Sequence, residues 1–189
     1  MAFIPAFAKD AGQALEFVDA AHQHCWYGVN PLVRSWLHCV ASEAIGRSSE
    51  PAGYQRRVDL AEESLDAVDD AAPDWFDFYD RSRLDGFAGY CALAAGDHEA
   101  AATRLRTSLA QLAPFATKQR TVLLADLATT CRNDVDQASV LLDEALDVLT
   151  EDWYATGHQR IGEVAGQLPE SPRRTEIQDR HRAMSSVVW

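Results

Sequence analysis

"GDHEAAATRLRTSLAQL" (residues 96–112) and "NDVDQASVLLDEALDVL" (residues 133–149) are two copies of one pattern, and they decide the fold class. A shift of 37 residues brings the copies into register, pairing Asp97 with Asp134, Ala101 with Ala138, and Ser108 with Ala145. In each copy two small residues lie seven positions apart, which places them two turns apart on one helix face. Small side chains there let a neighbouring helix approach closely. The chain therefore contains a repeated helical unit.

This arrangement is typical of a tetratricopeptide repeat, in which the second helix of each pair wedges between the first helices of its own pair and the next. Fainter copies lie upstream, where Ala14 and Ala21 are seven apart and Ser64 aligns with Ser108. The repeat-to-repeat shifts are 43, 44 and 37 residues, against roughly 34 in the standard motif. We predict an all-α, tetratricopeptide-like helical-hairpin array of about four degenerate pairs.

Apolar residues recur at spacings of three and four along most of the chain, and alternating runs typical of strands are missing. We predict helices at residues 10–27, 31–47, 51–70, 74–95, 97–113, 115–132, 134–150, 152–168 and 172–184. Their predicted starts are marked by Pro31, Pro51, Pro73, Pro114 and Pro172, with Asp97 and Asp134 as N-caps. We expect one domain over 1–189, whose first helix is the second half of a pair.

Composition limits the classes of function. With 47% apolar and 24% charged residues the chain is globular, and 17 basic against 29 acidic residues give a net charge of −12. This charge would repel a phosphate backbone, so we expect no direct nucleic-acid contact. Apolar stretches fall short of the roughly 20 residues of a membrane span, and "MAFIPAFAK" has no basic region at its start. We expect a cytoplasmic protein that makes no membrane contact and has reduced cysteines.

Motifs that carry catalytic or metal chemistry are weak. The sequence has no G-x-S-x-G, no glycine-rich phosphate loop and no H-E-x-x-H. A zinc site is conceivable from His24, Cys25, His38 and Cys39. Around a turn at residues 28–30, however, the two pairs would lie at levels about 6 Å apart along their helices. We therefore expect no metal and no cofactor, and the sequence identifies no catalytic residue.

Several longer segments carry a resemblance to a known family. They are "RSWLHCVASE" (34–43), "DWFDFYDRSRLDGFAGYCALAAGD" (74–97), "KQRTVLLADLATT" (118–130), "ALDVL" (145–149) and "WYATGHQRI" (153–161). Over residues 30–168 the chain resembles the C-terminal region of helix-turn-helix transcriptional regulators common in Streptomyces and related actinobacteria. The resemblance implies a tetratricopeptide-like sensor or protein-interaction module. It departs from the family in that these 189 residues contain no helix-turn-helix DNA-binding domain.

The segment 74–97 is rich in aromatic residues and acids. Read as one helix, it places Trp75, Phe78, Tyr79 and Ser82 on one stripe and Phe76, Tyr79, Arg83 and Phe87 on another. One stripe would pack against the next repeat, and the one with Arg83 would line a concave groove. The guanidinium of Arg83 suits a carboxylate or phosphate. The alternative is an internal ion pair of Arg83 with Asp77, Asp80 or Asp126.

If the first helices of successive pairs line one groove, its residues come from four pairs. We predict a ligand-binding groove formed by Trp36, His38, Tyr79, Arg83, Phe87, Gln119, Asp126, Trp153 and Tyr154. The occupant would be a small molecule, a peptide or a protein partner, and a homodimer is compatible with the pattern. The leading hypothesis is a regulatory sensor or interaction module. The alternative is a stand-alone enzyme or small-molecule carrier of a biosynthetic pathway on the same scaffold.

Overall fold

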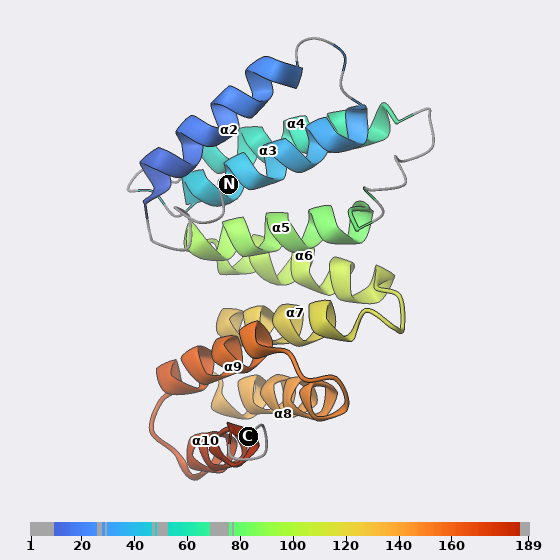
Figure 1. Cartoon of the computed structure of the whole chain (residues 1–189). Helices are drawn as coiled ribbons and strands as arrows, with labels where there is room; N and C mark the ends of the chain where they lie inside the picture. Colours follow the sequence, from blue (N-terminus) through green and yellow to red (C-terminus); the bar gives the residue numbers. More distant parts are fainter. Residues whose placement is uncertain are drawn as a thin grey trace. The chain divides into compact units, whose positions relative to one another are not determined.

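The computed structural model describes residues 10–25, 28, 30–46, 48, 53–68, 76 and 78–185. Regular structure within these residues is helical throughout, which confirms the all-α prediction (Figure 1). The helices are α2 (Ala11–Cys25), α3 (Pro31–Gly46), α4 (Tyr54–Asp66), α5 (Arg81–Ala94), α6 (His98–Gln111), α7 (Thr117–Thr130), α8 (Val135–Glu151), α9 (Ala155–Gln167) and α10 (Pro172–Ser185). The chain divides into two compact units, Met1–Arg104 and Leu105–Trp189.

In unit 1, α3 is the central helix. It contacts α2, α4 and α5, and α4 also contacts α5 (Figure 1). The apolar core between α3, α4 and α5 is built around Cys39, Ala61 and Leu84, to which Phe76 and Tyr79 are added from the segment before α5. Val18 on α2 packs against the other side of α3, at Val40 and Ala41. These contacts hold three helices, α2, α4 and α5, around α3.

In unit 2, α7 and α8 pack as a hairpin, and α9 contacts both of them. The last helix, α10, contacts α8 and α9 (Figure 1). Leu142, Leu146 and Leu149 on α8 are completely buried with Ile161 on α9. A Cβ atom on Gly157 would lie 2.7 Å from Cγ2 of Thr121, so α9 can approach α7 this closely only because residue 157 is glycine.

The repeat register predicted from the sequence is reflected in burial and capping. Ala101, Ser108, Ala138 and Ala145 are each 0% exposed. Both predicted N-caps are confirmed, because Asp97 Oδ1 accepts from Ala100 N at 3.0 Å and Asp134 Oδ1 accepts from Gln137 N at 3.1 Å. α3 and α10 begin at the predicted Pro31 and Pro172. Local chemistry therefore fixes these helix starts.

The prediction of one helix over 74–95 is wrong. Phe76, Phe78, Tyr79 and Asp80 are not helical, and α5 begins at Arg81. Asp80 is extended, with φ −148° and ψ −173°, and its carboxylate accepts from Arg83 N at 2.8 Å. An N-cap requires such a non-helical backbone, so Asp80 starts a helix and the two predicted aromatic stripes do not exist. Trp75 and Asp77 lie outside the described residues.

The helix predicted over 51–70 is shorter in the structure. α4 starts at Tyr54 after Gly53, and it ends at Asp66. Ala67 is in a turn, and the amide of Val68 donates to Leu65 O at 3.2 Å, which is the tighter bond of a closing helical turn. Periodicity alone extended the helix too far, because the apolar spacing continues after the backbone has left the helix.

Candidate functional site

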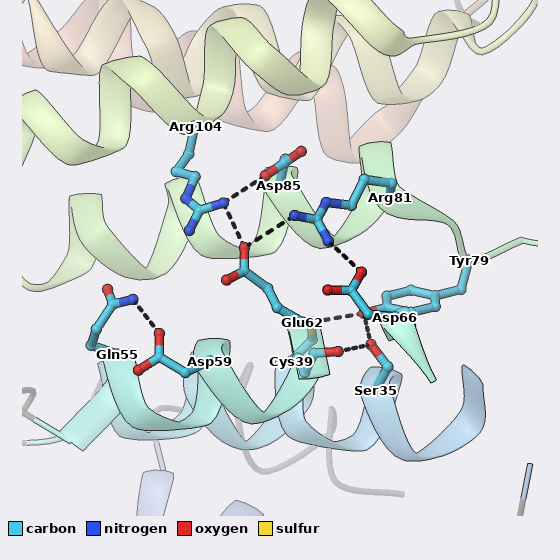
Figure 2. A network of polar contacts seen from close by, with 11 residues as sticks. Ser35, Cys39, Gln55, Asp59, Glu62, Asp66, Tyr79, Arg81, Asp85 and Arg104 are labelled. Carbon is cyan, nitrogen blue, oxygen red and sulfur yellow. Dashed lines mark hydrogen bonds and ion pairs between the residues drawn. The ribbon is translucent and has the colours of Figure 1, made fainter. Parts of the chain in front are cut away.

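A network of charged groups joins α4, α5 and α6 in unit 1 (Figure 2). Arg104 Nη1 lies 2.7 Å from Glu62 Oε1 and 2.9 Å from Asp85 Oδ1. Arg81 reaches the same Glu62 oxygen at 3.6 Å and Asp66 at 3.3 Å. The side chain of Asp85 is only 3% exposed. Although burial opposes it, the pKa of Arg104 is raised, because Glu62 and Asp85 hydrogen bond its charged form.

Beside this network, the hydroxyl of Tyr79 lies in a buried chain of hydrogen bonds (Figure 2). Ser35 Oγ donates to Ala61 O at 2.7 Å, so Tyr79 must donate its own proton to Ser35, at 2.8 Å. The thiol of Cys39 then donates to Tyr79 Oη at 3.1 Å. Burial raises the pKa of Cys39 to about 12, and burial together with Cys39 raises that of Tyr79. Both side chains are therefore protonated parts of the core.

Tyr79 was predicted to line a groove, but it is 4% exposed and packs in the core of unit 1. Phe87 is partly buried against the same core. The segment before α5 leads Phe76 and Tyr79 inward, because Phe76, Phe78, Tyr79 and Asp80 are not helical. Arg83 is exposed on the first turn of α5. Of the carboxylates considered as ion-pair partners of Arg83, Asp80 caps the start of α5, Asp77 lies outside the described residues, and Asp126 pairs with Arg160 in unit 2.

Trp36 is the centre of an aromatic cluster in unit 1. Its ring meets Phe76 edge to face at 5.7 Å and Phe78 at 6.2 Å, with an angle of 86° to the latter. Phe76 is buried, whereas Phe78 is 50% exposed. The name Trp36 surface is used below for Trp36, Phe78 and the exposed Arg83 of the same unit, and the closeness of Arg83 to the two rings is part of the proposal below. Its two aromatic rings pack edge to face against each other, and Arg83 is exposed on the same unit.

His38 does not line a surface with Trp36. It is 8% exposed, and its Nδ1 lies 3.2 Å from Nε2 of His22 on α2. His22 Nδ1 lies 3.0 Å from Val18 O and must carry a proton there, which leaves His22 Nε2 to accept from His38. Burial, His22 and the arginines Arg57 and Arg34 lower the pKa of His38 to about 4. The neutral pair joins α2 to α3.

In unit 2, Asp126 on α7 forms a buried ion pair with Arg160 on α9. Nε of Arg160 lies 2.7 Å from Asp126 Oδ1, and the aspartate side chain is 4% exposed. Arg160 also reaches Glu163 at 3.7 Å. Gln119 is partly buried on the first turn of α7. Asp126 thus connects two helices of unit 2 and is poorly placed to contact a ligand.

Trp153 begins a row of three rings in unit 2. It is 37% exposed, and its ring lies 5.0 Å from that of His158. His158 stacks on His181 of α10, with the ring centroids 3.8 Å apart. Tyr154, the N-cap of α9, is partly buried against the core. Trp36, His38, Tyr79, Arg83 and Phe87 belong to unit 1 and the other four predicted groove residues to unit 2, and the convergence of these two sets stays a prediction.

The described residues hold no cluster of three or more histidine, cysteine, aspartate or glutamate side chains that could bind a metal ion. His24 of the considered zinc set is exposed, and His38 is instead partnered by His22. All four cysteines are free thiols, with Cys39 and Cys91 buried. No helix in the described part of the chain has the length and hydropathy of a membrane span.

The sequence analysis did not identify the side chains that interact with the predicted site residues or hold the cores together. They are His22, Arg104, Arg160, His158 and His181, together with Phe78 as the ring that packs against Trp36. One available signal was that five of the six histidines lie on the first two and the last two of the described helices. Comparisons with protein-family models, with curated proteins and with solved structures found no match to this chain.

Proposed function

We propose that this chain is a helical-repeat binding module, used for sensing or for protein interaction, that binds a carboxylate-bearing ligand at the Trp36 surface. The resemblance to the C-terminal region of actinobacterial regulators is part of this proposal. The observation that carries it is the half-exposed ring of Phe78, held edge to face against Trp36 on the unit that exposes Arg83.

The helix contacts within each unit support a tetratricopeptide-like arrangement. In unit 1, α3 and α4 form the first pair, and both contact α5, the first helix of the next pair. In unit 2, α7 and α8 in the same way both contact α9. The second helix of a pair packs against the first helix of the next in such repeats. The buried small residues Ala101, Ser108, Ala138 and Ala145 support the same register.

The state of the reactive side chains supports binding over catalysis in unit 1. A nucleophilic cysteine needs an accessible thiol of lowered pKa, whereas Cys39 is buried and its pKa is raised to about 12. Tyr79 and Ser35 have their hydroxyl protons engaged in hydrogen bonds inside the core. The buried Asp85 is held by Arg104. These buried groups stabilise the fold of unit 1. We therefore place ligand recognition at the exposed side chains of the Trp36 surface.

The chemistry of the Trp36 surface indicates the class of ligand. Arg83 carries a planar guanidinium that can donate two parallel hydrogen bonds to one carboxylate. Phe78 offers an exposed aromatic face and edge for an apolar or aromatic group. Arg83 is also one of few cations in a chain of net charge −12. An acidic peptide and a small aromatic acid share the required chemistry, a carboxylate beside an apolar group.

Binding of two probes distinguishes an acidic peptide from a small aromatic acid as the ligand. Benzoate and a short blocked peptide that contains glutamate and phenylalanine are titrated into the full chain, and the indole signals are followed by NMR. We expect Arg83→Ala to weaken binding of the preferred probe by about tenfold or more, since a hydrogen bond to a charged group is lost. Phe78→Ala should weaken it as well. Tighter binding of the peptide identifies an interaction module, and tighter binding of benzoate a small-molecule sensor.

The matched control is Arg182→Ala, which removes an exposed arginine that pairs with Asp179 on α10 of unit 2. It should leave binding unchanged. Arg83→Ala should alter the free energy of unfolding by less than about 0.5 kcal/mol, because the residue is exposed. Equal binding by wild type and Arg83→Ala, or no binding of either probe at millimolar concentration, would contradict the proposal.

A further inference from the structure

The last helix of the described chain is attached to its neighbour through a pair of stacked histidines. His158 lies on α9 and His181 on α10, with ring centroids 3.8 Å apart and planes inclined by 18°. His181 Nε2 lies 2.9 Å from His158 O, and His158 Nε2 lies 3.2 Å from His181 O. Carbonyl oxygens only accept, so both Nε2 atoms carry protons. The bonds are reciprocal, and each ring is bound to the backbone of the other helix.

The backbone of α9 is shaped to accept this stack. A Cβ atom on Gly162 would lie 2.7 Å from Cε1 and 2.9 Å from Nε2 of His181. Only a glycine therefore lets the ring of His181 lie this close to α9. Both histidines are partly buried, so water screens their charges less than it would at an exposed site. The histidine stack is therefore a close-packed contact between α9 and α10 that requires glycine at position 162.

Protonation acts against this contact. With both Nε2 atoms already protonated, the next proton on either ring goes to Nδ1 and creates an imidazolium. Two imidazolium rings stacked at 3.8 Å repel each other, whereas separated rings in water do not. Burial lowers the pKa of His181, and the neighbouring His158 lowers it further, against the backbone bond to His158 that raises it.

We propose that the stacked pair His158 and His181 is an acid-sensitive latch that releases α10 from α8 and α9 as the pH falls below neutrality. Release would expose the apolar surface of unit 2 that α10 covers, including the contacts of the buried Ile177. The latch is independent of the function proposed for the Trp36 surface, because it lies wholly within unit 2.

Ion pairs among the described residues also join α10 to α8. α10 carries Arg173 and Arg180, and both pair with Asp143 on α8, while Arg180 also pairs with Asp147. On α9, His158 stacks on His181, and its ring also lies 5.0 Å from that of Trp153. Carboxylates in general take up protons near pH 4 and arginine stays charged, so between pH 7.5 and 5.5 histidines are the groups that titrate.

The lowered pKa of His181 determines the direction in which pH changes the attachment of α10. The attached helix favours the neutral ring, so its attachment is strongest above about pH 6.5, the ordinary pKa of histidine. As the pH falls below that value, the released state takes up protons that the attached state does not. Each such proton shifts the equilibrium towards release by up to about tenfold per pH unit. This continues until the pH reaches the lowered pKa of the attached state.

Hydrogen exchange on the full chain tests the latch. After correction for the intrinsic pH dependence of exchange, the opening constant of α10 amides should rise about tenfold between pH 7.5 and 5.5. Amides of α7 and α8 should keep their protection over this range, which separates release of α10 from general acid unfolding. A wild-type opening constant for α10 that does not change with pH would overturn the latch.

Two substitutions test whether the acid response of α10 depends on the stacked histidines. In His181→Gln the amide nitrogen can donate to His158 O in place of Nε2 but takes up no proton, so the acid response of α10 should be lost. His158→Gln makes the same change on α9. It provides the test if His181→Gln by itself detaches α10 at both pH values. His24→Gln, at an exposed position on α2, is the control and should respond like wild type. An undiminished acid response in either stack variant would overturn the proposal.

Discussion

In the described part of each unit one buried aspartate is held by an arginine, but the two aspartates are held in different ways. Asp85 in unit 1 pairs with Arg104 of α6, and Arg104 also contacts Glu62, which Arg81 reaches as well. Asp126 in unit 2 pairs with Arg160, whose second partner is Glu163 on its own helix. The first aspartate belongs to a network with two arginines, and the second pairs with Arg160. This difference predicts how each unit responds when an arginine is removed.

The largest effect is expected from Arg160→Ala. It would remove the ion pair of Arg160 with Asp126, whose side chain is 4% exposed. Loss of one member of a buried pair costs about 3 to 5 kcal/mol. Native-state hydrogen exchange of amides in α7 and α9 measures this locally. A loss below about 1 kcal/mol would show that water or another cation replaces Arg160.

Arg104→Ala sharpens the comparison and should cost less, about 2 kcal/mol. Arg81 lies one helical turn before Asp85 on α5 and already contacts Glu62, so it can approach the stranded carboxylate. Exchange in α5 and chemical denaturation report the loss. Addition of Arg81→Ala to Arg104→Ala should then cost more than Arg81→Ala does in wild type. Additive losses would contradict the shared network.

The histidine pairs of the two units extend the comparison to pH. His38 has its pKa lowered to about 4, so its neutral form stabilises unit 1 fully above the ordinary pKa of about 6.5. This contribution, at most about 3 kcal/mol, should be lost progressively as the pH falls from 6.5 to 4. In His38→Asn the amide can still donate to His22 Nε2 but does not titrate. Chemical denaturation at pH 7, 5.5 and 4.5 should show a flatter profile for this variant, and equal profiles would contradict the assignment.

The last prediction concerns the helix crossings. Ala145→Leu adds volume where Ala145 is completely buried, and overpacking of this kind costs about 1 to 3 kcal/mol. Ala138→Leu should behave alike. Val140→Leu on the same helix is the matched control, because Val140 is 63% exposed, and it should have an effect within about 0.5 kcal/mol. Unchanged thermal stability of both alanine variants would contradict the repeat register.

The segment before α5 shows where the pattern of residues misled. Aromatic residues at helical spacing favoured one helix over 74–95, yet Asp80 caps a helix that starts at Arg81. The same capping chemistry was interpreted correctly at Asp97 and Asp134, where a glycine or asparagine precedes the aspartate. At Asp80 the neighbouring aromatic residues hid the signal. Phe76 and Tyr79 are recruited to the core by α3 and α4, which are distant in sequence.

The sequence by itself determined the helical class, most helix starts and the buried positions Ala101, Ser108, Ala138 and Ala145, because these depend on contacts within one or two turns and on a repeated pattern of side-chain size. Only the tertiary structure decided the partners of the polar groups. Asp126 and Arg160 are 34 residues apart, and His158 and His181 are 23 apart. A charge or a ring offers the same local signal whichever distant group it meets, so its partner is fixed only when the helices pack and bury it.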